Sequence, residues 1–260
     1  MAKNPPAARP RRRLLRIWLP LLLLALLVGA CWWYLSDAYT ADEAAIAAFC
    51  ADFSAQERSL EDGTLAFGTG QEPVGLIFYP GGKVDHRAYV PLARALAEKG
   101  VFCVVCPMPF RLAVLDRDAA LEARQAFPEV GCWYVGGHSL GGVMAARCLA
   151  AHPEKFDGLL LLGAYADKDL SGCGVPVLSV YGSEDGVMNR SAYSECRGNL
   201  PGDAEELVLE GGCHAGFGMY GPQRGDGTPQ ISAAEQIQKT AQAVWDWIGR
   251  RERGADAEAA

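Results

Sequence analysis

The sequence predicts a three-layer α/β fold, in which helices cover both faces of a mostly parallel central sheet, preceded by one transmembrane helix. Short apolar segments alternate along the chain with segments of helical spacing. These apolar segments are hydrophobic throughout rather than at every second position, as in strands buried on both faces. An uncharged stretch at 17–35 predicts the transmembrane helix. Half of the 260 residues are hydrophobic, which suffices for one sizeable core and excludes general disorder.

The first 35 residues differ from the rest of the chain in charge. They carry six basic side chains and no acidic one, whereas the remaining 225 residues carry 18 basic and 31 acidic side chains, a net charge of −13. Nucleic acid is not expected as a partner of so acidic a body, because its binding rests on neutralising phosphates. The basic side chains precede the apolar stretch, so residues 1–16 are predicted to be cytoplasmic and the body extracytoplasmic, anchored in the cell membrane.

Residues 17–35 have the length and the flanks of a membrane span. As a helix they reach about 28 Å, close to the hydrocarbon thickness of a bilayer. Trp32 and Trp33 lie where an interfacial aromatic belt is expected. Two alternatives stay open: Gly29 and Ala30 are typical of a cleaved signal peptide, and with Cys31 they resemble a bacterial lipoprotein cleavage box. All three interpretations place the body outside the cytoplasm.

The elements of the body form one alternating series, which predicts a single domain. A linker with a short helix is expected at 36–62, the folded domain at 63–250 and a frayed tail at 251–260. Each predicted strand is an apolar run that ends near Gly or Pro: 64–67, 74–79, 101–106, 132–135, 159–162, 177–181 and 206–209. Helical spacing and helix-stop residues predict helices at 41–53, 89–99, 118–127, 140–151 and 233–250.

The most specific signal is Gly137-His138-Ser139-Leu140-Gly141, which lies between a predicted strand and a predicted helix. It matches G-x-S-x-G, a sharp turn that forces the serine into strained backbone angles and exposes its hydroxyl. Glycines two places before and after the serine leave room where side chains would clash. Ser139 is therefore the predicted nucleophile, and the Leu140 N–H is the predicted first oxyanion donor.

A serine nucleophile needs a base, and the chain offers four histidines. His138 adjoins the serine and is expected to point elsewhere. His152 precedes a proline at a helix end, and His86 lies at a helix start. His214 follows the last predicted strand, at the edge where an α/β sheet presents its site. His214 is therefore the predicted base.

The third member of a triad orients the imidazole and stabilises its charged form. Asp185 follows the predicted strand at 177–181 and is the favoured residue, with Glu184 as the runner-up. A plain acidic turn is the alternative.

The turn after the strand at 74–79 offers a second oxyanion donor. The Gly82 N–H is favoured and the Lys83 N–H comes next, while an ordinary Gly-Gly turn is the alternative.

The segment at 163–175 is too short for a folded lid domain, so the site is expected to be covered mainly by the loop at 216–230. Phe217, Met219 and Tyr220 in that loop are predicted to bind the substrate's acyl group. An ordered surface loop is the alternative.

These residues carry a resemblance to a known family. The chain resembles the α/β-hydrolase superfamily over about 65–248, and it is most similar to the small membrane-anchored bacterial α/β-hydrolase family 5 group, which is dienelactone-hydrolase-like. The turn at 79–85, the elbow at 137–142 and the segment at 211–221 support this. Relatives often have Asn before the histidine, where this chain has Cys213. The resemblance implies a hydrolase with a serine triad and says little about the substrate.

The predicted function is a membrane-anchored serine hydrolase that cleaves carboxylic esters by acyl transfer. The same triad can serve an amidase, a peptidase or an acyltransferase. A noncatalytic anchored binding protein is the alternative from another class. Calcium, flavin and nucleotide motifs are lacking, so no cofactor and no metal site are expected. The partners expected are a small-molecule acyl substrate and the membrane.

Eight of the nine cysteines lie outside the apolar N-terminal stretch, and an even number in an extracytoplasmic body permits disulfides. A Cys173–Cys196 bridge is the first expectation. Most of the others fall in or beside apolar elements, where free cysteine acts as a small hydrophobe.

Overall fold

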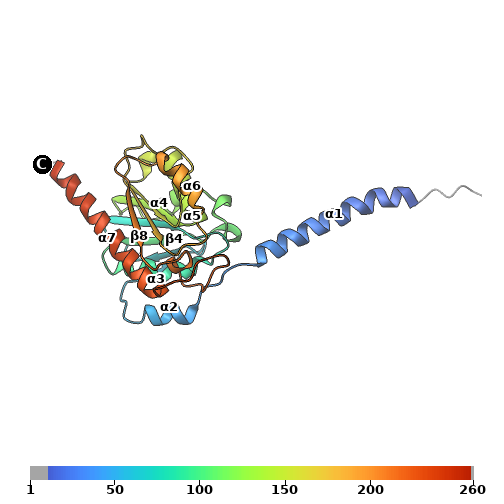
Figure 1. The fold of residues 1–260 in the computed structure, drawn as a ribbon, viewed down its shortest axis with the longest axis horizontal. Helices are drawn as coiled ribbons and strands as arrows, with labels where there is room; N and C mark the ends of the chain where they lie inside the picture. Colours follow the sequence, from blue (N-terminus) through green and yellow to red (C-terminus); the bar gives the residue numbers. More distant parts are fainter. Residues whose placement is uncertain (1–10, 259–260) are drawn as a thin grey trace, which may run out of the picture. The chain divides into compact units, whose positions relative to one another are not determined.

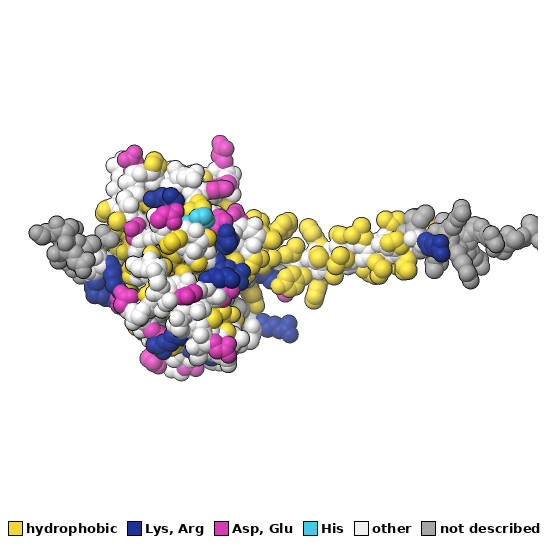
Figure 2. Space-filling view, turned by 90° about the horizontal axis from the view of Figure 1, so that it is seen from above, with side chains coloured by type: hydrophobic (Ala, Val, Ile, Leu, Met, Phe, Trp, Pro, Cys, Tyr) yellow, Lys and Arg dark blue, Asp and Glu magenta, His cyan; other side chains and the backbone are white. Residues whose placement is uncertain are grey.

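The computed structural model describes residues 11–258. Its chain separates into two compact units, residues 1–38 and residues 39–260. Helix α1, Arg11–Ser36, makes up most of the described part of the first unit. Figure 2 shows hydrophobic side chains along this helix. The stretch Trp18–Ser36 has 19 residues and a mean hydropathy of 1.9, and none of it is buried, so it is long and apolar enough to cross a membrane.

A mostly parallel sheet of eight strands forms the centre of the second unit in the described structure (Figure 1). The spatial order is β1-β2-β4-β3-β5-β6-β7-β8, in which β1 and β2 are antiparallel to their neighbours and the rest are parallel. The strands are β1 Glu57–Ser59, β2 Leu65–Phe67, β3 Val74–Tyr79, β4 Phe102–Val105, β5 Cys132–His138, β6 Gly158–Leu162, β7 Val177–Gly182 and β8 Glu205–Leu209.

Helices cover both faces of the sheet, which confirms the predicted fold class. The α-helices of this unit are α2 Glu43–Phe49, α3 Val90–Ala97, α4 Ala119–Ala126, α5 Leu140–Ala151, α6 Arg190–Cys196 and α7 Ala233–Glu258. Short 3₁₀ helices are η1 His86–Tyr89, η2 Pro109–Arg111, η3 Ala113–Leu115, η4 Pro153–Lys155, η5 Arg197–Asn199 and η6 Ala215–Phe217.

The core lies in two layers, one on each side of the sheet. Successive residues of β3 point to opposite faces, as strand geometry requires. Leu76 and Phe78 pack with α3 and α7, whereas Ile77 and Tyr79 pack with α4 and α5. A strand that buries both faces needs apolar residues at nearly every position, which explains why the apolar runs of β3, β4 and β6 do not alternate.

Among the strands and α-helices, β1 and α6 were not predicted, and β5 and α7 extend beyond their predicted ends. β1 consists of exposed polar residues and has no hydrophobic pattern to reveal it. α6 is one short helix within a connection, with only Tyr193 buried. α7 continues to Glu258, so the described part of the segment 251–260, where a frayed tail is predicted, is helical. The Arg, Glu and Ala residues there are strong helix formers.

The expected Cys173–Cys196 bridge is wrong, since all nine cysteines are free. Sequence spacing does not determine whether two Cα atoms come within disulfide distance, which is a tertiary property. Cys103, Cys106 and Cys148 are buried core residues, as predicted for cysteines in apolar elements.

Candidate active site

The elbow between β5 and α5 places Ser139 in a strained conformation. Its φ is 53° and its ψ is −123°, a region that residues other than glycine rarely adopt. A Cβ on Gly141 would lie 2.3 Å from the carbonyl oxygens of Tyr79 and Pro80, and a Cβ on Gly137 would lie 2.7 Å from the Tyr79 oxygen. Only glycine therefore lets the helix start so close to the end of β3.

The loops after β7 and β8 bring the predicted acid and base together. His214 Nδ1 lies 2.8 Å from Asp185 Oδ2, and both side chains are almost completely buried. The other carboxylate oxygen of Asp185 accepts the N–H groups of Val187 and Met188 at 2.9 and 2.8 Å. The runner-up, Glu184, accepts a hydrogen bond from Ser183 instead. The acid that contacts the imidazole is Asp185.

Gly163, which follows β6, makes room for the His214–Asp185 pair. Its φ is +54°, and a Cβ there would lie 2.9 Å from His214 Nδ1 and 3.1 Å from Asp185 Oδ2. The site thus needs glycine here both for the backbone conformation and for space. The sequence marks this position only as the end of a strand.

His214 Nε2, the atom that would receive the serine proton, is buried without a hydrogen-bond partner among the described residues. Ser139 is partly exposed and leads the first turn of α5. Its hydroxyl makes no hydrogen bond to His214 within the described chain. Such contacts commonly tighten only when substrate is present.

The two predicted oxyanion donors lie beside each other. A Cβ on Gly82 would lie 3.0 Å from Leu140 Cδ2, so the two residues are in contact. Within residues 11–258, neither the Gly82 N–H nor the Leu140 N–H donates to another residue, and both residues are partly exposed. The other candidate, the Lys83 N–H, already donates to the Arg111 carbonyl at 2.8 Å. The geometry favours Gly82.

His138 does not point away from the site, and that expectation was wrong. Its ring lies against the His214 ring, with centroids 4.4 Å apart. Its Nδ1 lies 2.7 Å from the Tyr89 hydroxyl, which itself accepts the Gly81 N–H at 3.0 Å. The hydroxyl proton is therefore free to be donated to His138. Burial, and secondarily the neighbouring His214, hold the pKa of His138 well below its usual value, so this ring is neutral.

Asp226 is a residue of the site that the sequence pattern does not single out. Its carboxylate accepts hydrogen bonds from four backbone N–H groups. The donors are Gly186 and His214 at 3.1 Å, Ala215 at 2.8 Å and Gly227 at 2.9 Å. Burial raises the pKa of this carboxyl, but the four hydrogen bonds together bring it below its usual value. Asp226 thus joins the loop of the acid to the loop of the base. Its position between two glycines was the available signal.

The three predicted acyl-binding residues do not share one exposed wall. Phe217 is fully buried, with its ring 5.5 Å from that of His138. Tyr220 is buried against Tyr39. Only Met219 of the three lines a cavity of about 700 Å³ beside the loop. Phe217 and Tyr220 therefore pack behind the site in this structure.

Comparison with known proteins supports this assignment of the fold. A family model described as alpha/beta hydrolase family matches residues 75–238. No curated protein sequence matches the chain. Among solved structures, a dienelactone hydrolase from Anabaena variabilis is similar with a TM-score of 0.55 at 15% identity, covering 75% of this chain and 98% of that one.

Two lipid hydrolases are similar to the same degree. A monoacylglycerol lipase from Paleococcus ferrophilus has a TM-score of 0.56 at 14% identity, covering 72% of this chain and 98% of its own. A bacterial membrane phospholipase A has a TM-score of 0.55 at 16% identity, and the match covers 92% of this chain and 98% of that one. Identities this low speak for the fold alone. The family model, which matches more than half of the chain, shows that this chain belongs to the α/β-hydrolase family.

Proposed function

We propose that the chain is a membrane-anchored serine hydrolase that cleaves carboxylic esters through an acyl-enzyme on Ser139. One observation carries the proposal. His214 Nδ1 is held 2.8 Å from the buried Asp185, while its Nε2 has no partner in the described structure. An imidazole held in this way at one nitrogen and free at the other is suited to act as a general base.

The proposed reaction has two steps. Ser139 attacks the ester carbonyl while His214 takes the hydroxyl proton, and the N–H groups of Leu140 and Gly82 stabilise the oxyanion. Asp185 keeps the imidazole in the required tautomer and stabilises its charged form. His214 then protonates the leaving alcohol, and water repeats the sequence to release the acid.

The proposed partners are a small-molecule acyl substrate and the membrane, which α1 would cross with the catalytic body outside the cytoplasm. Support for the span comes from Trp18–Ser36, 19 uncharged residues with a mean hydropathy of 1.9. Carbonate extraction of membranes tests this, because a chain held by α1 stays in the pellet. Release of the full-length chain into the supernatant would contradict the anchor.

A fluorophosphonate probe tests the serine chemistry. The full-length wild type should be labelled and Ser139→Ala should not. Ser194→Ala removes an exposed serine of α6 and should leave labelling unchanged. Folded wild type that resists labelling would favour the noncatalytic binding protein instead. Chromogenic esters of increasing acyl length, assayed beside matched amides, then separate an esterase from an amidase or peptidase, and added alcohols reveal acyl transfer.

A further inference from the structure

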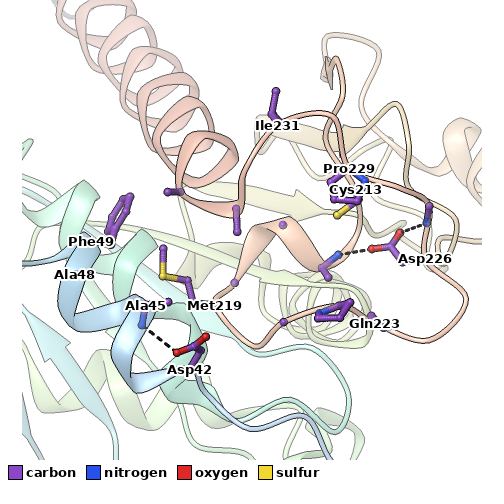
Figure 3. A pocket seen from close by; sticks show the side chains of 18 residues that line it. Asp42, Ala45, Ala48, Phe49, Cys213, Met219, Gln223, Asp226, Pro229 and Ile231 are labelled. Atoms are coloured by element: carbon purple, nitrogen blue, oxygen red, sulfur yellow. Dashed lines mark hydrogen bonds between the residues drawn. The ribbon is translucent and has the colours of Figure 1, made fainter.

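The cavity of about 700 Å³ is distinct from the nucleophile and its oxyanion donors. Its walls come from α2, from the loop between β8 and α7, and from the start of α7 (Figure 3). Ser139, Gly82 and Leu140 are not among its lining residues, whereas Cys213 and Ala215, the neighbours of His214, are. Its volume is that of an ordinary small-molecule site.

The cavity stays open because its walls are small residues held by backbone hydrogen bonds. Glycine and alanine make up half of the lining. The Asp42 N–H donates to the Met219 carbonyl at 2.8 Å, and the Met219 N–H donates to Ala88 at 2.8 Å, which ties α2 and the loop together. The Gln236 side chain bonds both backbone groups of Cys213. It accepts a hydrogen bond from the Cys213 N–H at 3.0 Å and donates one to the Cys213 carbonyl at 2.8 Å. The space is therefore preformed.

The chemistry of the walls selects for hydrocarbon. Phe49, Met219 and Ile231 line the cavity with alanines and prolines around them. Burial raises the pKa of the Cys213 thiol to about 11, so this thiol is neutral. The lining residues Ala48 and Gly221 are exposed, so the cavity is open to solvent.

Charge adds a second selection. The lining has two carboxylates, Asp42 and Asp226, and no Lys, Arg or His. Both carboxylates accept backbone N–H groups, from Ala45 in the first case and from four donors in the second. No lining cation compensates an incoming anion, so a negative head group is repelled.

We propose that this cavity binds one alkyl chain with a neutral or cationic head group, as a ligand separate from the acyl group on Ser139. The preformed apolar walls accommodate the chain, and the carboxylates exclude fatty-acid anions. The proposal does not depend on the hydrolase chemistry, because the cavity includes neither the nucleophile nor its oxyanion donors.

Photolabelling of the full-length chain in phosphatidylcholine vesicles tests this. Three dodecyl probes carry the same diazirine and end in trimethylammonium, glucoside or carboxylate. Peptide mapping should find the first two on 43–49 and 213–231, and the carboxylate should label these segments about tenfold less. Labelling should persist in Ser139→Ala and after fluorophosphonate treatment. Equal labelling by all three probes, or loss of labelling when Ser139 is blocked, would overturn the proposal.

Variants localise the site. Ala48→Trp and Ala234→Trp fill the cavity from α2 and from α7, and each should reduce labelling about tenfold, since a filled pocket excludes the chain. Ala44→Trp places the same side chain at an exposed position of α2 outside the lining and should change nothing. The two filling variants test the site independently if one fails to fold. Unchanged labelling in a folded filling variant would contradict the assignment.

Asp42→Asn tests the charge selection separately. Asparagine is as good an N-cap as aspartate, so α2 should keep its start. Removing one of the two carboxylates should raise labelling by the carboxylate probe and lower labelling by the trimethylammonium probe. If neither probe responds, the head-group selection is refuted.

Discussion

The imidazole of His138 lies 4.4 Å, centroid to centroid, from the imidazole of His214, at an interplanar angle of 47°. His138 is in turn bound to the Tyr89 hydroxyl, and that hydroxyl accepts the Gly81 N–H beside the proposed oxyanion donor. The ring of the proposed base, the elbow and the oxyanion turn are therefore joined by one buried chain of contacts.

Replacing Tyr89 should break this chain. Tyr89→Phe leaves the Gly81 N–H and His138 Nδ1 unpaired in a buried site, which should cost about 1–3 kcal/mol of unfolding free energy. Urea unfolding of the full-length chain in detergent measures the loss. Tyr165→Phe is the matched control, because no described residue hydrogen-bonds that hydroxyl. Equal stability of the two variants would show that the Tyr89 bonds contribute nothing.

The acid of the proposed triad can be separated from its neighbour. Asp185→Asn should lower kcat by about 10⁴-fold, because the amide no longer selects the reactive tautomer of His214. Glu184→Gln should change kcat only a few-fold, since Glu184 bonds Ser183 and not the imidazole. Ester hydrolysis by both variants under saturating substrate is the measurement. A larger loss in Glu184→Gln would reassign the acid.

Gly163 offers a test of the space around the His214–Asp185 pair. Gly163→Ala should lower kcat, because the new Cβ would lie 2.9 Å from His214 Nδ1. It should also cost about 1–2 kcal/mol through its positive φ. Gly174→Ala has a similar φ of +69° with nothing within 4 Å, so it should lose stability and keep its kcat. If kcat falls equally in Gly163→Ala and Gly174→Ala, backbone strain alone would explain the effect.

Asp226 should make the free energy of unfolding depend on pH. Its folded pKa is lowered, so its contribution is complete above the unfolded value of about 3.9 and is lost as pH falls through the folded pKa. Asp226→Asn should therefore be less stable than wild type at pH 7, with the difference shrinking below about pH 4. Its kcat should also fall, because the loops of Asp185 and His214 share this carboxylate.

Chemical denaturation across the pH range measures this dependence. Asp52→Asn, at an exposed position, should stay within about 0.5 kcal/mol of wild type throughout. A pH-independent difference between Asp226→Asn and wild type would show that the carboxylate charge is not what stabilises the two loops.

Much of the fold could be predicted because the signals are local. β3 and α5 were predicted with the bounds that the structure has, since each is a long apolar or helical run between glycine and proline breakers. β1 could not be predicted, because its three residues are polar and exposed and its strand pairing is with β2 alone in the described sheet. The expected Cys173–Cys196 bridge is absent for a related reason. A disulfide requires two Cα atoms to lie close together, and sequence spacing does not determine that distance.

The sequence by itself determined the fold class, the elbow around Ser139 and the choice of His214 and Asp185 as candidates. It could do so because a G-x-S-x-G turn and residues that follow apolar strands are properties of neighbouring positions. Only the tertiary structure decided that His138 lies on His214, that Gly163 makes room for the imidazole and that Asp226 joins two loops. Those contacts, like the one between Tyr89 and His138, which are 49 positions apart, link residues distant in the sequence. They depend on how the ends of the strands meet in the folded sheet.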